Sequence, residues 1–491
     1  MLPSKMKVNK KLLPIKGHFF LFNAGTAPLV PYLSTYARQL GFSSATVGLI
    51  YTILPIFGLI AKPLFGIIAD KYKKQKVIFI LFQIITIVSF SAIYFIPGNG
   101  SKLTVEIDCG DGATVLKSCF KRADQIDTCK VDSLGDMPSN VTSLCHVSAI
   151  IHIRDATYLN EETSQFTIQF WLFFLMMIIS WIGQAVVVTF ADAICFNLLG
   201  TKISQYGKQR LWGSVGWGIF SLLTGTLIDL YSDGAYKDYT IAFILMFVFM
   251  MGDVIVSIFL NVESTKMSMN ILADVGALLS SLPTFVFLMW TVAVGLCTGL
   301  LWQFLFWHLE DISKLTCNGS DYIKTLQGLV SAIQTFCGEI PFLFVSGFIL
   351  KRLGHVNMMS LVLFAFGVRF ILYSFLSNPW WVLPIEMLQG ITFGMFYPTM
   401  TSYATVVSPP GTETTVQGLV GAVFEGVGTS LGSFIGGQLY ERYGGWNTFQ
   451  WFGLGSLACC VLHIIVQYLL KDKSVGLNQG KDEALNTDHA D

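Results

Sequence analysis

Twelve apolar stretches, each about 20 residues long or longer, constrain the fold of this chain more than any other feature. They lie near 17–38, 45–69, 77–97, 166–198, 210–231, 239–260, 281–307, 325–350, 357–377, 380–405, 417–440 and 447–470. A stretch of this length can cross the hydrocarbon core of a bilayer as a single helix. With 53% hydrophobic and only 13% charged residues, the 491-residue chain is too apolar for a soluble protein of its length. We therefore predict an all-α membrane protein with twelve transmembrane helices.

Polar stretches divide these helices into two groups of six. One polar stretch, near 98–165, separates the third and fourth helices, and another, at 261–280, separates the sixth and seventh. We expect an N-terminal six-helix bundle over 1–260, which includes the loop at 98–165, and a C-terminal bundle over 281–470. A cytoplasmic linker is expected at 261–280, and a disordered cytoplasmic tail at 471–491.

The lysines and arginines predict the orientation. They gather before the first helix and after the second, fourth and eighth, which all lie on one side if twelve helices alternate. Because cytoplasmic loops are enriched in Lys and Arg, that side is expected to be the cytoplasm, with both termini there and the plasma membrane as the location. The sequons at Asn140 and Asn318 then lie outside, as candidate glycosylation sites. The basic N-terminus runs straight into the first apolar stretch, so no cleavable signal peptide is expected.

The external loop near 98–165 carries four cysteines, which predict two disulfides with three alternative pairings. These residues are Cys109, Cys119, Cys129 and Cys145. The loop resembles a small stapled cap more than a catalytic domain.

A charge pair and an aromatic residue near the fourth and fifth helices predict a solute site. On a helix, Arg210, Ser214 and Trp217 share one face, and a short turn would bring Asp192 to Arg210 at a similar depth. Charges inside a bilayer usually face a partner or a watery cavity. An acid, a base, a hydroxyl and an indole together suit a ring-shaped, hydroxyl-rich solute. The alternative is an interfacial ion pair beside a tryptophan that packs against lipid.

Four more charged residues fall within apolar stretches of the second half. Three of them, Glu339, Arg369 and Glu386, are candidates for a proton relay, and Glu425 is a fourth member of this group. A carboxylate that alternates between an arginine and a dry pocket can bind and release a proton. The alternative is a static ion-pair network that locks helices 8, 9 and 10 together.

Other residues have weaker assignments. Lys62 and Asp253 are expected to make structural pairs, and Glu310 and Asp311 to be gate or surface residues. Further candidates for the cavity are Asn23, Trp302 and Gln303. In membranes, polar residues of this kind often join helices instead.

The end of the second helix resembles the loop motif between helices 2 and 3 of the major facilitator superfamily. Gly66, Asp70, Lys71 and Lys74 follow that motif, whereas Lys73 stands where a glycine is usual. Similar ends of the second and eighth helices agree with the two related halves of such transporters. The resemblance implies twelve helices in two pseudo-symmetric bundles.

A second match is more specific. The run Arg210-x-x-Gly213-x-Val215-Gly216-Trp217 resembles the start of helix 5 in the lactose-permease-type oligosaccharide/proton symporters. Those proteins carry an acid, usually glutamate, eighteen places before the arginine, where this chain has Asp192. The resemblance implies that Asp192 and Arg210 bind substrate hydroxyls and that Trp217 stacks on a sugar ring.

The tenth helix departs from that family. Gln389 and Thr392 stand where lactose-permease-type proteins carry a histidine and a proton-carrying glutamate, and Glu386 could take over that role. The large loop and the run Pro384–Gly390 look closer to the animal "major facilitator domain-containing protein 6" group.

Two functions are consistent with these features. The first is a secondary transporter of a small polar solute, sugar-like or nucleoside-like, with a proton as candidate coupling ion. The second is a cell-surface receptor that uses the large loop on a transporter scaffold. No metal-spaced cluster, nucleophile elbow or nucleotide loop occurs, so we expect no enzyme activity, cofactor or metal. The net charge of zero gives no support for nucleic-acid binding, and the sequence does not specify an oligomeric state.

Overall fold

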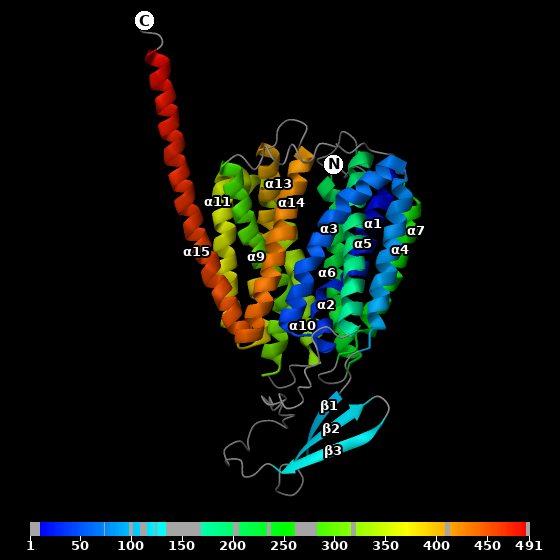
Figure 1. Ribbon diagram of the computed structural model, residues 1–491. Helices are drawn as coiled ribbons and strands as arrows, with labels where there is room; N and C mark the ends of the chain where they lie inside the picture. The colour runs from blue at the N-terminus through cyan, green and yellow to red at the C-terminus, as the bar shows by residue number, and fades with distance from the viewer. Residues whose placement is uncertain are drawn as a thin grey trace, which may run out of the picture.

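A computed structural model describes residues 10–72, 74–97, 102–108, 115–122, 125–133, 168–199, 206–232, 237–260, 282–315, 321–407 and 413–487. Its body is a bundle of long helices that run roughly along one common axis (Figure 1). Eight of the described helical spans are long and apolar enough to cross a membrane. The all-helical membrane body predicted from the sequence is therefore confirmed.

The N-terminal half consists of five long helices and one broken helix. The long helices are α3 (Ser44–Tyr72), α4 (Gln75–Tyr94), α5 (Ile168–Leu199), α6 (Tyr206–Leu230) and α7 (Thr240–Ile258). The broken one consists of η1 (Lys10–Leu12), α1 (Leu13–Thr26), η2 (Val30–Tyr32) and α2 (Leu33–Gln39). Pro28 and Pro31 lie at the break, because proline has no backbone N–H to continue the helical ladder.

The C-terminal half contains helices interrupted by π-helical turns. Its elements are α9 (Leu282–Ser313), α10 (Ile323–Ile333), the π-helix η6 (Gln334–Glu339), α11 (Ile340–Ser374), η7 (Pro379–Trp381), α12 (Val382–Glu386), the π-helix η8 (Gly390–Met395), α13 (Phe396–Val407), α14 (Glu413–Ala422), the π-helix η9 (Val423–Thr429) and α15 (Ser430–Thr487). Single π-helical turns inside α-helices are frequent at functional sites.

Two described spans are too long for one crossing. The spans Ile323–Ser374 and Leu419–Leu469 contain 52 and 51 residues. At about 1.5 Å per residue, each is roughly 75 Å long, against about 30 Å of hydrocarbon. Each turns back at a glycine with positive φ, Gly354 (73°) and Gly444 (74°), a conformation that glycine adopts without steric cost. These glycines lie where the sequence separates helices 8 and 9 and helices 11 and 12. The total of twelve crossings stays a prediction.

The chain differs from expectation at its C-terminal end. The composition of 471–491 predicts disorder, whereas α15 continues to Thr487 and projects away from the bundle (Figure 1). The stretch 471–487 contains no proline and includes the helix formers Lys, Leu, Glu and Ala, which favour continuation of the helix. The predicted linker at 261–280 lies outside the described residues.

The loop near 98–165 contains a small antiparallel sheet that the sequence analysis did not predict. Strands β1 (Lys102–Asp108), β2 (Val115–Arg122) and β3 (Gln125–Ser133) pair in that order. Their register places Cys119 opposite Cys129, and such opposed residues have Cα atoms about 4.5–5.5 Å apart, within the range that a disulfide spans. Cys109, Cys145 and the sequons at Asn140 and Asn318 lie outside the described residues. The disulfides and glycosylation stay predictions.

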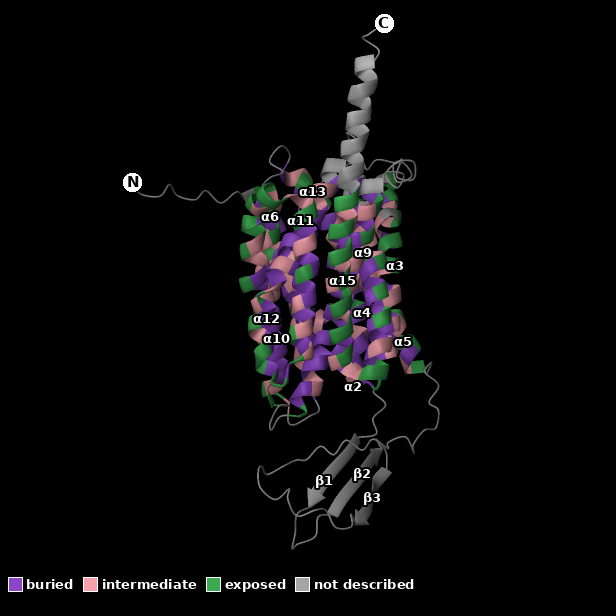
Figure 2. Cartoon of the chain, turned by 90° about the vertical axis from the view of Figure 1, so that its left-hand side faces the viewer, coloured by how far each residue is buried: buried purple, intermediate pink, exposed green. Residues whose placement is uncertain are grey.

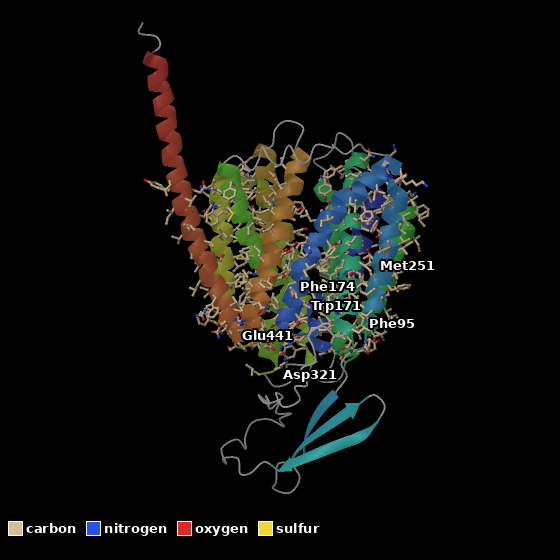
Figure 3. All side chains as sticks on the ribbon, viewed as in Figure 1. Phe95, Trp171, Phe174, Met251, Asp321 and Glu441 are labelled. Carbon is tan, nitrogen blue, oxygen red and sulfur yellow. The ribbon has the colours of Figure 1, made fainter. Side chains whose placement is uncertain are left out.

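Residue burial follows a membrane-protein pattern. Buried residues lie between the helices, and exposed ones cover the outer faces (Figure 2). Large apolar side chains such as Trp171 and Met251, labelled in Figure 3, are exposed on the bundle. The span that contains α9 is the most buried of the described spans, with 67% of its apolar window covered. This burial indicates that α9 is enclosed by protein.

Two glycines allow α6 to approach α1 closely. A Cβ atom at Gly213 would lie 2.7 Å from Asn23 Nδ2, and one at Gly216 would lie 2.6 Å from the backbone oxygen of Phe20. Both distances are shorter than a carbon contact allows, so these positions accept no side chain without a shift of a helix.

We expect Gly216→Ala to destabilise the N-terminal half by about 1–3 kcal/mol, the usual cost of overpacking a tight interface. Thermal unfolding of the purified protein in detergent would measure this. Gly455→Ala is the matched control, because a Cβ there has nothing within 4 Å. Equal melting temperatures for the two variants would contradict the close α1–α6 contact.

Candidate functional site

The structure brings Asp192 and Arg210 together. Arg210 Nη1 donates to both carboxylate oxygens of Asp192, at 2.9 Å each, across the gap between α5 and α6. Tyr206 completes the group: its hydroxyl donates to Asp192 at 2.7 Å and accepts from Arg210 at 2.8 Å. Tyr206 was not among the predicted site residues, although it stands four residues before Arg210 and therefore on the same helical face.

This pair faces the other half of the protein. Within apolar spans, the side chains of Arg210 and Asp192 are 45% and 27% exposed. Tyr397, on α13 of the C-terminal half, lies within electrostatic range of both. This position is consistent with a solute site, and the alternative of an interfacial pair beside lipid stays open. Ser214 and Trp217, farther along α6, are half-buried.

A fully buried charge network lies in the C-terminal half. Arg369, on α11, forms an ion pair with Glu386, on α12, and both side chains are shielded from solvent. Tyr373 accepts from Arg369 Nε at 2.7 Å and donates to Glu386. Gln334 donates to Glu386 at 2.6 Å, so the carboxylate has several partners.

The two residues that replace the family's proton-carrying groups belong to the same network. Gln389 and Thr392 accept hydrogen bonds from Arg369 Nη1, at 2.5 and 2.9 Å. Gln389 also donates to Glu339 at 3.2 Å. Three predicted relay residues, Glu339, Arg369 and Glu386, are therefore connected. Their arrangement fits both a relay and the static network given as its alternative.

Glu425 does not share a described contact with that network. It lies instead 3.6 Å from Lys62 of α3, in the other half, as an ion pair whose side chains are 39% (Lys62) and 51% (Glu425) exposed. The prediction that grouped Glu425 with the relay is not supported by this geometry. The reason is that Glu425 lies on η9, next to Lys62 of α3, whereas the relay residues lie on α11, η6 and α12.

The other cavity candidates differ from one another. Asn23 donates to the backbone oxygen of Phe19 at 2.8 Å and packs on Gly213, which is a helix-joining role. Gln303 is buried. Trp302, in contrast, is 46% exposed and lies near the rings of Phe393 and Phe424, with centroids 6.2 and 6.5 Å away.

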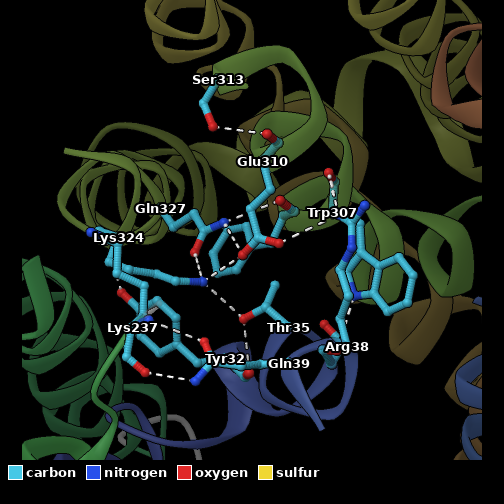
Figure 4. A network of polar contacts seen from close by, with 12 residues as sticks. Tyr32, Thr35, Arg38, Gln39, Lys237, Trp307, Glu310, Ser313, Lys324 and Gln327 are labelled. Atoms are coloured by element: carbon cyan, nitrogen blue, oxygen red, sulfur yellow. Dashed lines mark hydrogen bonds and ion pairs between the residues drawn. The ribbon is translucent and has the colours of Figure 1, made fainter. Parts of the chain in front are cut away.

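A polar network joins the two halves (Figure 4). It lies at the end of the bundle near residues 97 and 168, where Figure 1 shows α2 and α10, and this end is here called the loop end. Arg38, on α2, forms ion pairs with Glu310 and Asp311 of α9. Lys324, on α10, is buried and donates to Glu310 at 2.5 Å and to Thr35 at 3.1 Å. We call these five residues the clamp. The gate role considered for Glu310 and Asp311 gains support from these contacts.

Further hydrogen bonds between the halves lie at the same end. Trp307 Nε1 donates to the Ser34 backbone oxygen at 2.9 Å, and Ser44 Oγ donates to Glu441 at 2.6 Å. The Thr325 backbone N–H donates to Asp229 at 2.6 Å. Among the described residues, these bonds all come from the loop-end parts of α2, α3 and α6. The halves are thus closed against each other at the loop end.

The N-terminal half contains a separate buried cluster. Asp253, on α7, accepts from Gln83 at 2.8 Å and lies 2.8 Å from His18 Nδ1. Gln83 also donates to Ser257 at 2.8 Å. The cluster joins α1, α4 and α7, in agreement with the structural pairing expected for Asp253.

The loop motif after α3 is only partly described. Gly66 is buried, and Lys71 and Lys74 are exposed. The side chain of Asp70 lies outside the described residues. No group of three His, Cys, Asp or Glu that could hold a metal ion occurs among the side chains that the structure describes.

Comparison with known proteins agrees with this architecture. The chain matches the model of the MFS_1 like family over residues 12–451, and it therefore belongs to that family. It is 22% identical to "Major facilitator superfamily domain-containing protein 6-like" of Danio rerio, over 87% of this chain and 82% of the relative. It is 23% identical to a maltose permease of Geobacillus stearothermophilus, over 92% of this chain and 91% of that one.

Solved structures show the same fold. The nucleoside transporter NupG superposes with a TM-score of 0.67 at 15% identity, over 93% of this chain and 98% of that one. A D-xylose-proton symporter superposes with a TM-score of 0.58 at 12% identity, over 92% and 96%. The predicted resemblance to the major facilitator superfamily is confirmed. The protein is a multi-pass secondary transporter of a small solute and not an enzyme.

Proposed function

We propose that this protein moves a small, hydroxyl-rich solute across the plasma membrane by alternating access. Asp192, Arg210 and Tyr206 bind hydroxyl groups of the solute, and Trp217 packs on its ring. The observation that carries the proposal is the Asp192–Arg210 pair, which is partly exposed within apolar spans and faces Tyr397 of the other half. The relatives point the same way, since maltose permease, NupG and the xylose symporter are named for sugars and nucleosides.

The state of the molecule supports the same mechanism. The charge bias along the sequence assigns the loop end to the outside and both termini to the cytoplasm. The clamp then closes the outer end, and the partly exposed Arg210 pair is reached from the cytoplasm. Alternating access requires a second state in which the clamp opens and the cytoplasmic ends of the halves meet.

The buried network is the candidate for coupling to a proton. Glu386 contacts Arg369 directly, and Glu339 contacts Gln389, which also binds Arg369. A change in the helix packing would therefore alter the partners of both carboxylates. We propose that a proton enters this network when Arg369 and Glu386 separate during the transport cycle. The π-helical turns η6 and η8, which flank it, supply local backbone freedom.

Substitutions at Arg210 test the solute site. We expect Arg210→Ala to reduce uptake into proteoliposomes about 10- to 100-fold, because charge-assisted hydrogen bonds contribute about 1.5–3 kcal/mol each. Trp217→Ala should reduce uptake about tenfold, because the packing of an aromatic ring on the solute is lost. Uptake of labelled sugars and nucleosides would be measured against wild type.

The matched controls are Arg352→Ala and Trp451→Ala, at exposed positions on α11 and α15. They should transport like wild type. If Arg210→Ala and Trp217→Ala also moved every solute as wild type does, the site assignment would be wrong.

The receptor alternative rests on the loop at 98–165, whose side chains lie outside the described residues. Deleting that loop should leave transport intact under our proposal and abolish partner binding under the alternative.

A further inference from the structure

An exposed tryptophan on an enclosed helix marks a second surface for the solute. Between Cys297 and Leu309 every residue of α9 is buried except Trp302. A helix enclosed on its other faces can expose one side chain only toward an opening inside the protein. Trp302 therefore faces that internal opening rather than lipid.

Further rings extend this surface. Phe393, on η8, lies between Trp302 and Tyr397, with ring centroids 6.2 Å from Trp302 and 5.9 Å from Tyr397. Tyr397 is 40% exposed, and it lies within electrostatic range of Arg210 and Asp192 as well as of Glu425. Tyr397 thus connects the hydroxyl-binding pair of one half with the aromatic surface of the other.

The ion pair beside this surface has unused hydrogen-bonding capacity. The 3.6 Å between Lys62 Nζ and Glu425 Oε2 exceeds a normal hydrogen bond, and both side chains are about half-exposed. The buried pair of Arg369 and Glu386 differs, because its atoms are engaged by several neighbours. Lys62 and Glu425 can therefore offer a donor and an acceptor side by side to a third group.

We propose that Trp302, Phe393, Tyr397, Lys62 and Glu425 form an aromatic subsite that binds a planar, hydrogen-bonding ring. This inference rests on the proposed function and narrows its solute: a hydroxylated ring at Asp192–Arg210 joined to a heteroaromatic ring, as in a nucleoside. Stacking on aromatic side chains recognises the faces of such a ring, and a donor beside an acceptor matches its edge.

A second sugar ring fits this subsite less well. A sugar carries several hydroxyls, and each needs a partner once it is removed from water. The nearby polar groups Gln389, Thr392 and Gln334 already bind Arg369 or Glu386. The aromatic subsite has apolar rings and one ion pair, which suits a flat ring with few polar atoms.

The test measures binding by the full-length purified protein with defined probes. Uridine and adenosine should raise its melting temperature, and D-ribose, uracil, adenine and maltose should need about 100-fold higher concentrations for the same rise. Trp302→Ala should weaken nucleoside binding about tenfold or more, and Trp302→Phe should keep it within a few-fold of wild type. Glu425→Gln should weaken binding of one nucleoside more than the other, because it changes one edge partner.

Trp171→Ala is the matched control, since this tryptophan projects outward from α5 (Figure 3), and it should bind nucleosides like wild type. Melting of the unliganded variants shows that each is folded.

The inference is overturned if maltose binds as tightly as the nucleosides, or if neither nucleoside stabilises wild type at about 10 mM. Maltose binding that is lost in Arg210→Ala but kept in Trp302→Ala would retain the proposed function without the aromatic subsite. Nucleoside binding lost in Trp302→Ala but kept in Arg210→Ala would retain the subsite and reject the proposed hydroxyl site.

Discussion

Arg369→Met is expected to destabilise the protein by about 3–5 kcal/mol, the usual cost of removing one partner of a buried ion pair. The substitution leaves the Glu386 carboxylate shielded from solvent without its counter-charge. It also removes the donor to Tyr373, Gln389 and Thr392. A large fall in the melting temperature of the purified protein is the expected result.

The double variant Arg369→Met/Glu386→Met separates this effect from a general loss of packing. Replacing both members of a buried pair by apolar residues is often neutral, so the double variant should recover most of the lost stability. Arg210→Met is the matched control, because its pair is partly exposed and exposed pairs contribute only about 0–1 kcal/mol. A double variant as unstable as Arg369→Met would contradict the assignment of the cost to the orphaned carboxylate.

The same double variant tests the coupling role. If the network carries a proton, this folded variant should equilibrate solute across the membrane but fail to accumulate it against a gradient. Accumulation equal to that of wild type would identify the network as a structural lock of helices 8, 9 and 10.

Lys324→Met is expected to open the loop end. In the closed state described here, Lys324 is buried against Glu310 and Thr35 at the interface of the halves. Its loss leaves Arg38 as the counter-charge of Glu310 and removes a charge-assisted hydrogen bond, at a cost of about 1.5–3 kcal/mol to the closed state. A bias of this size shifts a two-state equilibrium by roughly 10- to 100-fold.

Cysteine labelling measures this shift. Ser34 is buried at the interface, and its backbone oxygen accepts from Trp307, so Ser34→Cys reports on opening. A membrane-impermeant thiol reagent applied from outside should label Ser34→Cys at least about tenfold faster when Lys324→Met is also present.

Two comparisons control this experiment. Gly225→Ala should act in the same direction, because its Cβ would lie 2.1 Å from the Lys324 backbone oxygen across the interface. Lys314→Met should have little effect, because Lys314 is exposed just after the end of α9 and Asp311 keeps its ion pair with Arg38. Equal labelling rates with and without Lys324→Met would show that the clamp does not hold the outer end closed.

Several features of the site were predictable because they depend on local sequence. Asp192 and Arg210 are eighteen residues apart on consecutive helices, so a short connection brings them to one depth. The close contact at Gly213 and Gly216 follows from missing side chains on one face of a helix. Tyr206 was predictable by the same periodicity but was overlooked.

The clamp was not predictable from local pattern. Arg38 and Lys324 lie at helix ends. A charge is common at such positions, so its presence in the sequence does not indicate that it needs a buried partner. Both bind Glu310, and the residues belong to different halves of the chain. Which charges meet depends on how the two bundles are rotated and how deeply each helix sits. Glu425 is a further example. Its position within an apolar stretch of the second half suggested a place in the relay, but the side chain pairs with Lys62 of the other half.

The amino-acid sequence alone determined that this protein crosses a membrane many times, that its body is helical and that its buried charges need partners. These conclusions follow because hydrocarbon penalises unpaired backbone and charge wherever they occur in the chain. Only the tertiary structure decided which charges pair, which end of the bundle is closed, and that Trp302 faces inward. Such pairings join helices far apart in sequence, and their free energy depends on distance and burial, which no local pattern encodes.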